Sequence, residues 1–372
     1  MARRRSFGSV RQLASGRWQV RYYGPDGLRR SAPKTYERKR DAELALAKLE
    51  ADLARDDWFD PQAGKIKLGV FGRAWLTEHP DLAKTTYERY EIAFRRYVVP
   101  RFGNVAINEI READVRSWYA GLLKAGVGRA SVAKAYRVVR AILNTALDDG
   151  MIKRNPCRIQ GAGDDKSEER PVLSVDEVLR VVDALPPRFR MMAYLATFTS
   201  LRFGELAALT RRDVDVTAGV VTVRQSQAQL NNGELFLKDP KSDAGKRVVP
   251  IPDELLDELK HHLAEYAEAG ESDRVFVGAQ GGHLRRQNFR KIWLRAIAKS
   301  GVSPVHFHDL RHTGNTLAAE SGATMRELME RMGHASTQAA MIYLHVSKGR
   351  SRHIADNLSE QIRRAREKGD EQ

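Results

Sequence analysis

The chain has 372 residues, a length that suggests two or three domains. Hydrophobic residues make up 42% and charged residues 30% of it, which excludes a fully disordered chain. No apolar run reaches the ~20 residues of a membrane-spanning helix, so we expect a cytoplasmic protein with no membrane partner. The single cysteine, Cys157, excludes an internal disulfide and cysteine-based zinc modules. The 63 Lys and Arg against 48 Asp and Glu give a net charge of +15, which favours a polyanionic partner.

Most of this charge lies near the N-terminus. Residues 1–40 hold twelve Lys or Arg and two acidic residues, a net of +10. Apolar and polar side chains alternate over residues 16–23 and turn residues follow at 24–27, so we predict a small basic β-sheet, with a helix over residues 37–56. A basic tail without a specific ligand is the alternative. Arginines that alternate with aromatic side chains suit a nucleic-acid groove, and the candidate DNA contacts are Arg17, Arg21, Arg29 and Arg30.

Residues 66–156 are predicted to form a bundle of about four helices. Apolar side chains recur at three- and four-residue spacings over residues 71–79, 85–99, 112–123 and 129–149. We expect Pro100 and Gly103 to separate the second helix from the third. A polar, glycine-containing linker is expected over residues 157–170. The candidate DNA contacts of this bundle are Arg95, Lys134 and Arg137. The alternative is an ordinary solvent-exposed helix face, which would carry a similar set of basic residues.

The following block, residues 171–350, has a mixed pattern. Ser174 and Glu177 form a capping box that opens a helix. Strands are predicted over residues 219–224, 235–237 and 247–251. A tight hairpin turn at Asn232-Gly233 precedes the second strand, and Lys241 lies in the polar loop between the second and third.

Histidines give the first indication of chemistry in this block, because seven of the ten lie between residues 283 and 353. His308 and His312 could share a helical face as metal ligands, but the metalloprotease pattern needs Glu where this chain has Asp309. Both could also be ordinary core or surface histidines. A third interpretation pairs His308 with Arg311, three residues on, as a proton-transfer group beside an anion clamp.

These residues resemble the signature of the tyrosine recombinases, the phage-integrase family. The segment from His308 to Thr313, followed by Gly333-His334 and Tyr343, is similar to the family's C-terminal motifs. Upstream segments resemble its first arginine motif and its β-hairpin lysine motif. Six positions match in the family's order: Arg202, Lys241, His308, Arg311, His334 and Tyr343. Two departures, Ser242 and Met332 where Thr and Leu are common, remove no functional group.

The resemblance implies covalent phosphoryl transfer with Tyr343 as the nucleophile, which leaves a 3′-phosphotyrosine and a free 5′-hydroxyl. Arg202 and Arg311 would stabilise the charge on the phosphate, a task that suits the planar guanidinium. Lys241 would protonate the leaving 5′-oxygen. Because these cations supply the positive charge, no metal and no other cofactor is expected.

Three further roles follow from the resemblance. His308 is the candidate general base or proton relay for Tyr343, and His334 would hydrogen-bond the scissile phosphate. Glu205 would orient an active-site arginine or histidine as a buried carboxylate, with a surface glutamate as the alternative.

The implied fold is multidomain, mainly α with small β-sheets. It has an N-terminal small β-sheet plus helix, a helical SAM-like core-binding bundle and an α+β tyrosine-recombinase catalytic domain. We expect an arm-type DNA-binding domain over residues 1–60 and a core-binding domain over residues 66–156. A linker over 157–170, a catalytic domain over 171–350 and a tail helix over 351–372 are expected to follow.

The segment 1–60 resembles the arm-binding domain of integrases, so an integrase of a phage or mobile element in a bacterial host is favoured. The implied partners are double-stranded DNA with core and arm attachment sites and three further copies of the chain in a homotetramer. A directionality factor and a host DNA-bending protein are further candidates. The alternatives are a resolvase-type or topoisomerase IB-like enzyme with the same chemistry, or a DNA-binding protein without catalysis.

Overall fold

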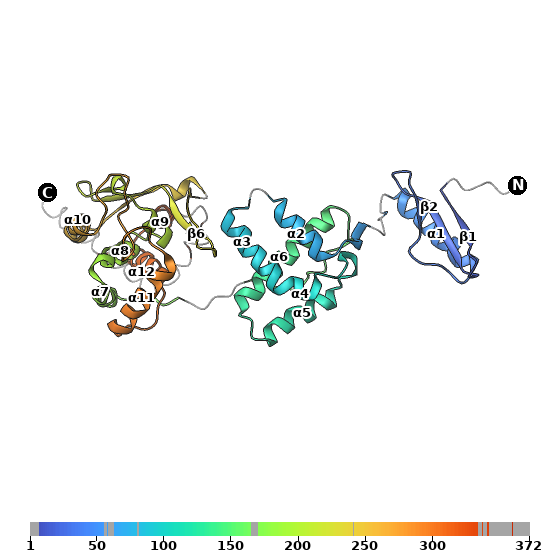
Figure 1. Ribbon diagram of the computed structural model, residues 1–372, viewed down its shortest axis with the longest axis horizontal. Helices are drawn as coiled ribbons and strands as arrows, with labels where there is room; N and C mark the ends of the chain where they lie inside the picture. Colours follow the sequence, from blue (N-terminus) through green and yellow to red (C-terminus); the bar gives the residue numbers. More distant parts are fainter. Residues whose placement is uncertain are drawn as a thin grey trace. The chain divides into compact units, whose positions relative to one another are not determined.

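The computed structural model describes residues 7–55, 58, 63–79, 82–164, 170–240 and 242–333, with Thr337, Met341 and Ser359 beyond them. The chain divides into two compact units, Met1–Ser167 and Glu168–Gln372. The described residues are mostly helical with small antiparallel sheets (Figure 1), which confirms the predicted fold class. None of their helices is long and apolar enough to cross a membrane.

The N-terminal part is the predicted sheet with a helix on one face. Its strands are adjacent in chain order and antiparallel: β1 (Gly8–Gln12), β2 (Trp18–Tyr23) and β3 (Arg29–Ser31). Helix α1 (Lys39–Ala54) follows, and its Leu46 forms a small core with Val20 and Tyr22 of β2. Since side chains alternate along a strand, Arg21 is turned to the face opposite α1.

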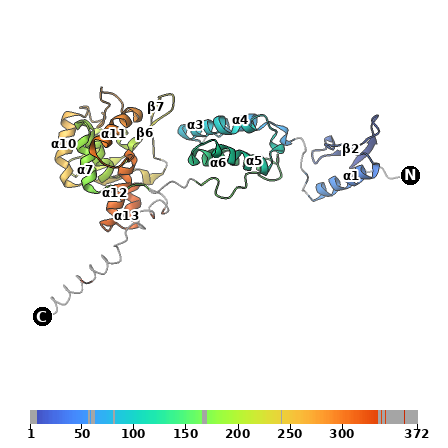
Figure 2. The same cartoon turned by 90° about the horizontal axis from the view of Figure 1, so that it is seen from below.

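The helical bundle has its own core around a long buried helix. Its helices are α2 (Leu68–Thr77), α3 (Lys84–Ala93), α4 (Val99–Phe102), α5 (Glu112–Lys124) and α6 (Arg129–Asp148). Short 3₁₀ turns, η1 (Ala63–Lys65) and η3 (Ile107–Glu109), precede α2 and α5. Helix α6 runs beside α3 (Figure 2), and its Val139, Ile142 and Leu143 are fully buried.

The prediction that Pro100 separates two helices is wrong. Helix α3 continues through a π-turn, η2 (Phe94–Val98), into α4, and Pro100 lies in the first turn of α4. A π-turn widens the helix, and early helical positions tolerate the missing N–H of proline, so the chain stays helical. Gly103 is the residue at which the helix ends.

The expected linker over residues 157–170 begins too early. Cys157 and Ala162 are buried in the core of the bundle, and the Ile159 N–H donates to the Tyr136 hydroxyl at 2.8 Å. Glycines and charged residues separate these apolar residues, so their spacing does not predict a segment that packs on the bundle. Residues 157–164 therefore pack with the bundle, and 165–169 lie outside the described residues.

The second unit is built around two helices that pack closely against each other. Helix α8 (Pro187–Phe198) is buried on nearly all sides and packs against α12 (Phe307–Glu320), as Figure 1 shows. The other helices are α7 (Val175–Ala184), α9 (Phe203–Ala208), α10 (Leu256–Glu265), α11 (Arg286–Ser300) and α13 (Met325–Met332). The capping box at the start of α7 is confirmed, because Ser174 Oγ accepts from the Glu177 N–H at 3.2 Å.

The strands of this unit form two sheets. One has the order β4-β5-β8, from β4 (Val214–Asp215), β5 (Val220–Val223) and β8 (Arg247–Pro250). The other is the hairpin of β6 (Ser226–Gln229) and β7 (Leu235–Lys238), closed by the predicted turn at Asn232-Gly233. Strand β6 was not predicted, because Ser226-Gln227-Ala228-Gln229 has neither β-branched nor aromatic residues.

Candidate active site

The site begins where α8 and α12 approach each other backbone to backbone. A Cβ atom at Gly314 of α12 would collide with the carbonyl oxygen of Thr197 in α8. The neighbouring Thr313 is fully buried, and its Oγ1 accepts from the Leu173 N–H at 3.1 Å. This close packing fixes the position of Arg311, one helical turn before Gly314, relative to the chain that leaves α8.

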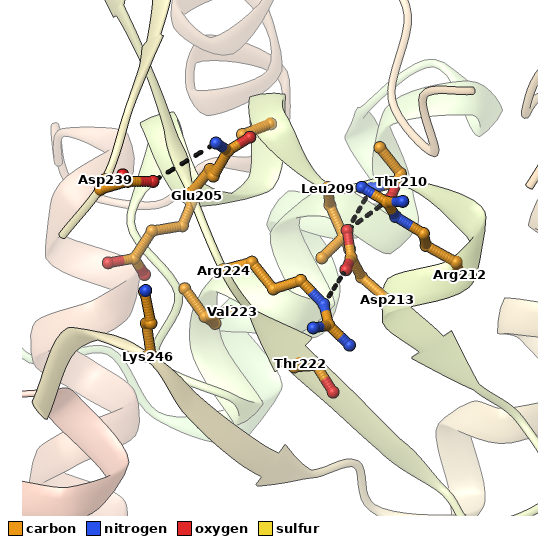
Figure 3. Close-up of a pocket in the computed structure, with 12 residues that line it drawn as sticks. Glu205, Leu209, Thr210, Arg212, Asp213, Thr222, Val223, Arg224, Asp239 and Lys246 are labelled. Atoms are coloured by element: carbon orange, nitrogen blue, oxygen red, sulfur yellow. Dashed lines mark hydrogen bonds and ion pairs between the residues drawn. The ribbon is translucent and has the colours of Figure 1, made fainter. Parts of the chain in front are cut away.

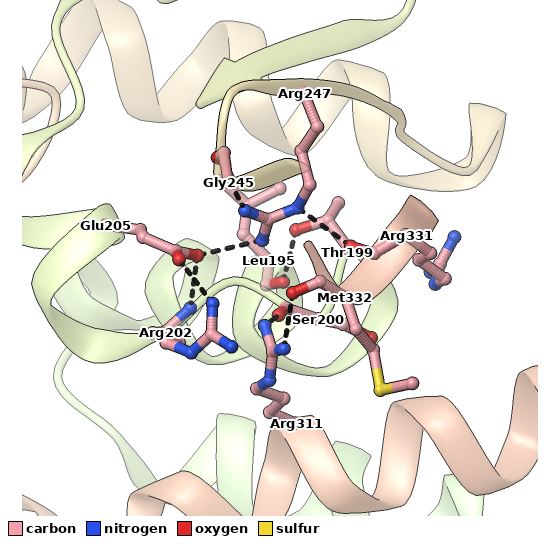
Figure 4. A network of polar contacts seen from close by, with 10 residues as sticks. All are labelled: Leu195, Thr199, Ser200, Arg202, Glu205, Gly245, Arg247, Arg311, Arg331 and Met332. Carbon is pink, nitrogen blue, oxygen red and sulfur yellow. Dashed lines mark hydrogen bonds and ion pairs between the residues drawn. The ribbon is translucent and has the colours of Figure 1, made fainter. Parts of the chain in front are cut away.

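The residues that leave α8 turn sharply at Ser200, which has a positive φ of 56°. A non-glycine residue in this conformation costs about 1–3 kcal/mol, and such strain is concentrated at functional sites. The turn exposes the Ser200 carbonyl to Arg311 Nη1, while Arg311 Nη2 donates to the Met332 carbonyl at 2.7 Å (Figure 4). It also places Arg202 at the start of α9.

Glu205 joins two arginines from distant parts of the sequence. Its carboxylate accepts from the Arg202 N–H at 2.9 Å and from Arg202 Nη1 at 2.8 Å. Arg247 Nη2 donates to Glu205 Oε2 at 2.9 Å (Figure 4). Burial opposes ionisation of Glu205, but Arg247 and Arg202 outweigh it and lower the pKa of the carboxyl to about 2. Glu205 is therefore a buried, ionised carboxylate and not a surface glutamate.

Positive charge exceeds negative charge in this network. Figure 4 draws the guanidiniums of Arg202, Arg247, Arg311 and Arg331 with one carboxylate, that of Glu205, which contacts Arg202 and Arg247. Arg331 donates to the Phe198 carbonyl instead of to an acid. Burial and then the charge of Arg247 lower the pKa of Arg331. A concentration of cations that carbonyl dipoles hold in place suits an anionic ligand such as a phosphodiester.

His308 lies at the exposed start of α12, one turn before Arg311. Partial loss of solvent, and then the charges of Arg311, Arg170 and Arg202, lower the pKa of His308 to about 4. The next residue, Asp309, is buried, pairs with Arg170 at 2.7 Å and accepts from the His306 N–H at 2.7 Å. His308 is consequently neutral near pH 7 and can accept a proton.

Three of the expected catalytic residues, Lys241, His334 and Tyr343, lie outside the described residues. The structure brings together the other expected residues: Arg202, Glu205, His308 and Arg311. The described part of the chain contains no group of three or more His, Cys, Asp or Glu side chains that could hold a metal ion. His312 is buried within α12 and belongs to no such group among the described residues.

Sequence reasoning missed Arg247 and Arg331. Arg247 stands in the segment that resembles the lysine motif, but nothing in its spacing indicates that it faces Glu205. Arg331 looks like an ordinary cation at the end of a helix. Only the tertiary contacts of these two side chains reveal them.

A pocket of about 270 Å³ lies beside Glu205 (Figure 3). Thr222 and Val223 of β5 line it, as do Asp239 and Lys246, which flank Lys241 in the sequence. There is consequently open space next to the loop that joins β7 to β8.

The predicted DNA contacts of the N-terminal sheet fall into two groups. Arg21 shares one face of the sheet with Arg11 and Arg29, because Ser9 pairs with Arg21 and Tyr23 with Arg29. Slight desolvation, and then the charges of Arg11 and Arg29, lower the pKa of Arg21. Arg17 and Arg30 instead make intramolecular contacts. Arg17 Nε donates to Thr35 Oγ1 at 2.8 Å. Arg30 forms two hydrogen bonds to Asp26, at 2.5 and 2.7 Å, and lies 5.0 Å from the centre of the Trp58 ring.

The predicted contacts of the bundle are on its surface. Arg95 is exposed in the π-turn and pairs with Glu91 at 2.8 Å. Lys134 and Arg137, three residues apart on α6, are half-buried and exposed respectively.

The chain matches three family models along its length. They are "Phage integrase, N-terminal domain" over residues 6–55, "Phage integrase, N-terminal SAM-like domain" over 71–123 and "Phage integrase family" over 171–350. It is 35% identical over 366 residues to a putative prophage phiRv2 integrase of Mycobacterium tuberculosis, with 96% of each chain covered. It is 36% identical over 372 residues to the integrase of Mycobacterium phage L5, covering 96% of this chain and 98% of that one.

Solved structures share the fold. An integrase of the transposon Tn1549, in complex with a circular intermediate DNA, has a TM-score of 0.70 at 19% identity, covering 79% of this chain and 99% of that one. A lambda integrase tetramer bound to a Holliday junction has a TM-score of 0.59 at 18% identity, covering 92% of this chain and 96% of that one. Fold and sequence together define an enzyme that cuts and rejoins DNA. The chain belongs to the phage integrase family and is a site-specific tyrosine recombinase.

Proposed function

We propose that this recombinase integrates a phage or mobile element at attachment sites through a 3′-phosphotyrosine intermediate, and excises the element by the reverse reaction. The observation that carries the proposal is the convergence of Arg202 and Arg311 at one strained turn, although the two lie far apart in the sequence. The match of residues 6–55 to an integrase N-terminal domain favours an integrase over a two-domain resolvase or a topoisomerase IB-like enzyme.

In the proposed reaction, Arg202 and Arg311 bind the non-bridging oxygens of the scissile phosphate. Their charge is fixed before the substrate arrives, so it stabilises the transition state without reorganisation. Tyr343 attacks phosphorus, and its proton passes to neutral His308. His334 adds a hydrogen bond to the phosphate. The phosphotyrosine retains the energy of the broken bond, so the reverse attack by a 5′-hydroxyl reseals a strand.

Lys241 protonates the 5′-oxygen as it leaves. Nearby arginines would lower the pKa of this lysine and so favour proton release. The pocket beside the β7–β8 loop leaves room for the loop to change position when DNA binds. This supports a lysine that reaches the leaving group only in the DNA complex.

The N-terminal sheet is proposed to bind arm sites on double-stranded DNA through Arg21 and Arg29. Their clustering with Arg11 on one face provides the positive charge that phosphates attract. Arg17 and Arg30, which are held by Thr35 and Asp26, support the sheet and can add contacts at its rim. In the bundle, Arg95, Lys134 and Arg137 are the proposed contacts to core-site DNA.

The assembly is proposed to be a homotetramer on two duplexes. Lambda integrase, which shares the fold, forms a tetramer on a Holliday junction. The tail over residues 351–372, of which the structure describes only Ser359, would pack on a neighbouring subunit. A directionality factor or a host DNA-bending protein would set the balance between integration and excision.

A nicked core-site duplex tests the proposal. Cleavage releases a short fragment that diffuses away with its 5′-hydroxyl, so the strand cannot be resealed and the covalent intermediate accumulates. The wild-type protein should accumulate a protein–DNA adduct in EDTA. Tyr343→Phe should bind the same duplex and form no adduct. An adduct that persists in Tyr343→Phe would show that another residue is the nucleophile.

A further inference from the structure

Arg247 is a buried arginine at the start of β8, and its guanidinium holds three different segments of the second unit. Its side chain is only 3% exposed. Nε donates to the Arg331 carbonyl at 2.8 Å, Nη1 to the Gly245 carbonyl at 3.3 Å and Nη2 to Glu205 Oε2 at 2.9 Å (Figure 4). Each guanidinium nitrogen therefore has an acceptor from a different part of the chain.

Each of these three segments leads to a residue of the proposed mechanism. Glu205 also accepts from Arg202 Nη1, at 2.8 Å. Gly245 belongs to the loop that contains Lys241. Arg331 is in the last turn of α13, three residues before His334.

The end of α13 is closely fitted to Arg247. Gly333 ends the helix with a φ of 63°, and a Cβ atom there would lie 2.9 Å from the Ala244 carbonyl oxygen and 3.0 Å from Arg247 Nη1. A side chain at position 333 would displace either the lysine loop or the guanidinium. The loop that contains Lys241, the Arg247 guanidinium and the turn at Gly333 are thus packed directly against one another.

A purely structural role explains this arrangement poorly. Burying a guanidinium is costly, and an apolar side chain of similar volume usually stabilises a core at least as well as a buried ion pair. An apolar side chain could not orient Glu205 and two backbone carbonyls at once, whereas the planar donors of arginine can. The geometry is better suited to holding catalytic segments in a fixed relation than to stability alone.

We propose that Arg247 is a positioning residue for DNA cleavage. Through Glu205 it fixes Arg202, and through the Gly245 and Arg331 carbonyls it aligns the lysine loop and the segment after α13 with that arginine. The inference rests on the proposed roles of Arg202 and Lys241. Arg247 itself contacts neither DNA nor the reacting atoms.

Arg224 provides a matched control in the same unit. Its Nε pairs with Asp213 Oδ1 at 2.9 Å, and the Asp213 carboxylate, like that of Glu205, is 8% exposed. The Arg224 side chain is 58% exposed, and its described ion-pair partner, Asp213, lies in a segment without a proposed catalytic residue. Arg224→Ala removes an ion pair of the same length and should leave cleavage unchanged.

The test compares single-turnover cleavage of a nicked core-site duplex by the full-length wild type, Arg247→Ala, Arg247→Met, Arg247→Lys and Arg224→Ala. Misplacing reacting groups by about 1 Å can cost roughly 100-fold in rate, so we expect a loss of about that size for Arg247→Ala at unchanged DNA affinity. Arg247→Lys should recover only part of the rate, because an ammonium cannot reproduce the planar donors. Arg247→Met keeps the buried volume and should be as slow as Arg247→Ala.

A second substrate separates positioning from folding. A sulfur in place of the bridging 5′-oxygen leaves as a thiolate, which needs no proton from Lys241. If Arg247 aligns the lysine loop, the defect of Arg247→Met should be smaller on this substrate than on normal DNA. Wild-type rates for both Arg247→Ala and Arg247→Met, or equal losses on both substrates, would overturn the inference. A wild-type protein that forms no adduct would instead contradict the proposed function, and this inference with it.

Discussion

Arg311 of α12 donates to the carbonyl oxygen of Ser200, whose left-handed backbone turns that carbonyl toward it. This bond ties an arginine of one central helix to the turn that leaves the other. It depends on the separation of α8 and α12, which is set where Gly314 meets Thr197. The position of Arg311 is thus controlled by a buried glycine.

Gly314→Ala should therefore impair both stability and cleavage. The added methyl group meets backbone of α8, which cannot rotate away as a side chain could. Overpacking of this kind costs about 1–3 kcal/mol, and we expect the upper end of that range. Chemical denaturation gives the loss of stability, and adduct formation well below the unfolding midpoint gives the effect on the site. Gly121→Ala in α5, where a Cβ atom would meet nothing within 4 Å, is the control.

The contribution of Glu205 to the stability of the second unit should be lost in acid. Its pKa is about 2 in the folded protein, below its ordinary value of 4.5, so folding favours the ionised form. Its contribution is complete above pH 4.5 and is lost as the pH falls toward 2. Breaking a buried ion pair costs about 3–5 kcal/mol, so Glu205→Gln should be destabilised by about that amount near pH 7. Urea unfolding between pH 3 and 7 should show a difference that narrows in acid; a constant difference would contradict the assignment.

The cleavage rate should respond to the ionisation of His308. The neutral imidazole is the form that accepts a proton, so the rate falls as the pH drops through its pKa. Because that pKa is about 4 in the free protein, rates measured before DNA saturation should stay high well below pH 6.5. His308→Gln should lower the rate and remove this acidic limb. If His308→Gln loses cleavage rate over the same pH range and to the same extent as the wild type, a group other than His308 causes that loss.

Salt dependence tests the N-terminal sheet. Each phosphate contact that is lost should lower the slope of log affinity against log salt by about 0.9. We expect this change for Arg21→Ala on full-length protein and arm-site DNA. Lys48→Ala changes an exposed lysine on α1, which packs on the other face of the sheet, and should leave the slope unchanged. Equal slopes for all three proteins would contradict a role of this face in DNA binding.

The sequence predicted the parts of the fold that depend on local pattern. The sheet around Trp18 and Tyr23 and the long helix around Ile142 follow from alternation and helical spacing. The helix break predicted at Pro100 does not occur, because a π-turn just before it relieves the usual penalty of proline. Strand β6 was missed because Gln227 and its neighbours carry no strand propensity.

The site was predictable only to the extent that motifs identify it. Arg202, Glu205, His308 and Arg311 were found by resemblance, and the structure brings them together. Arg247 could not be found in this way, because its role depends on two backbone carbonyls that have no signature in sequence. Contacts of this kind become visible only when the segments are folded against one another.

The position of the protein–DNA bond tests the central claim most directly. After cleavage of a nicked core-site duplex, proteolysis and mass spectrometry should locate the nucleotide on the peptide that contains Tyr343, joined through a 3′-phosphate. The other DNA end should carry a free 5′-hydroxyl that a kinase can label. A bond to a different residue, or a link through a 5′-phosphate, would contradict the account.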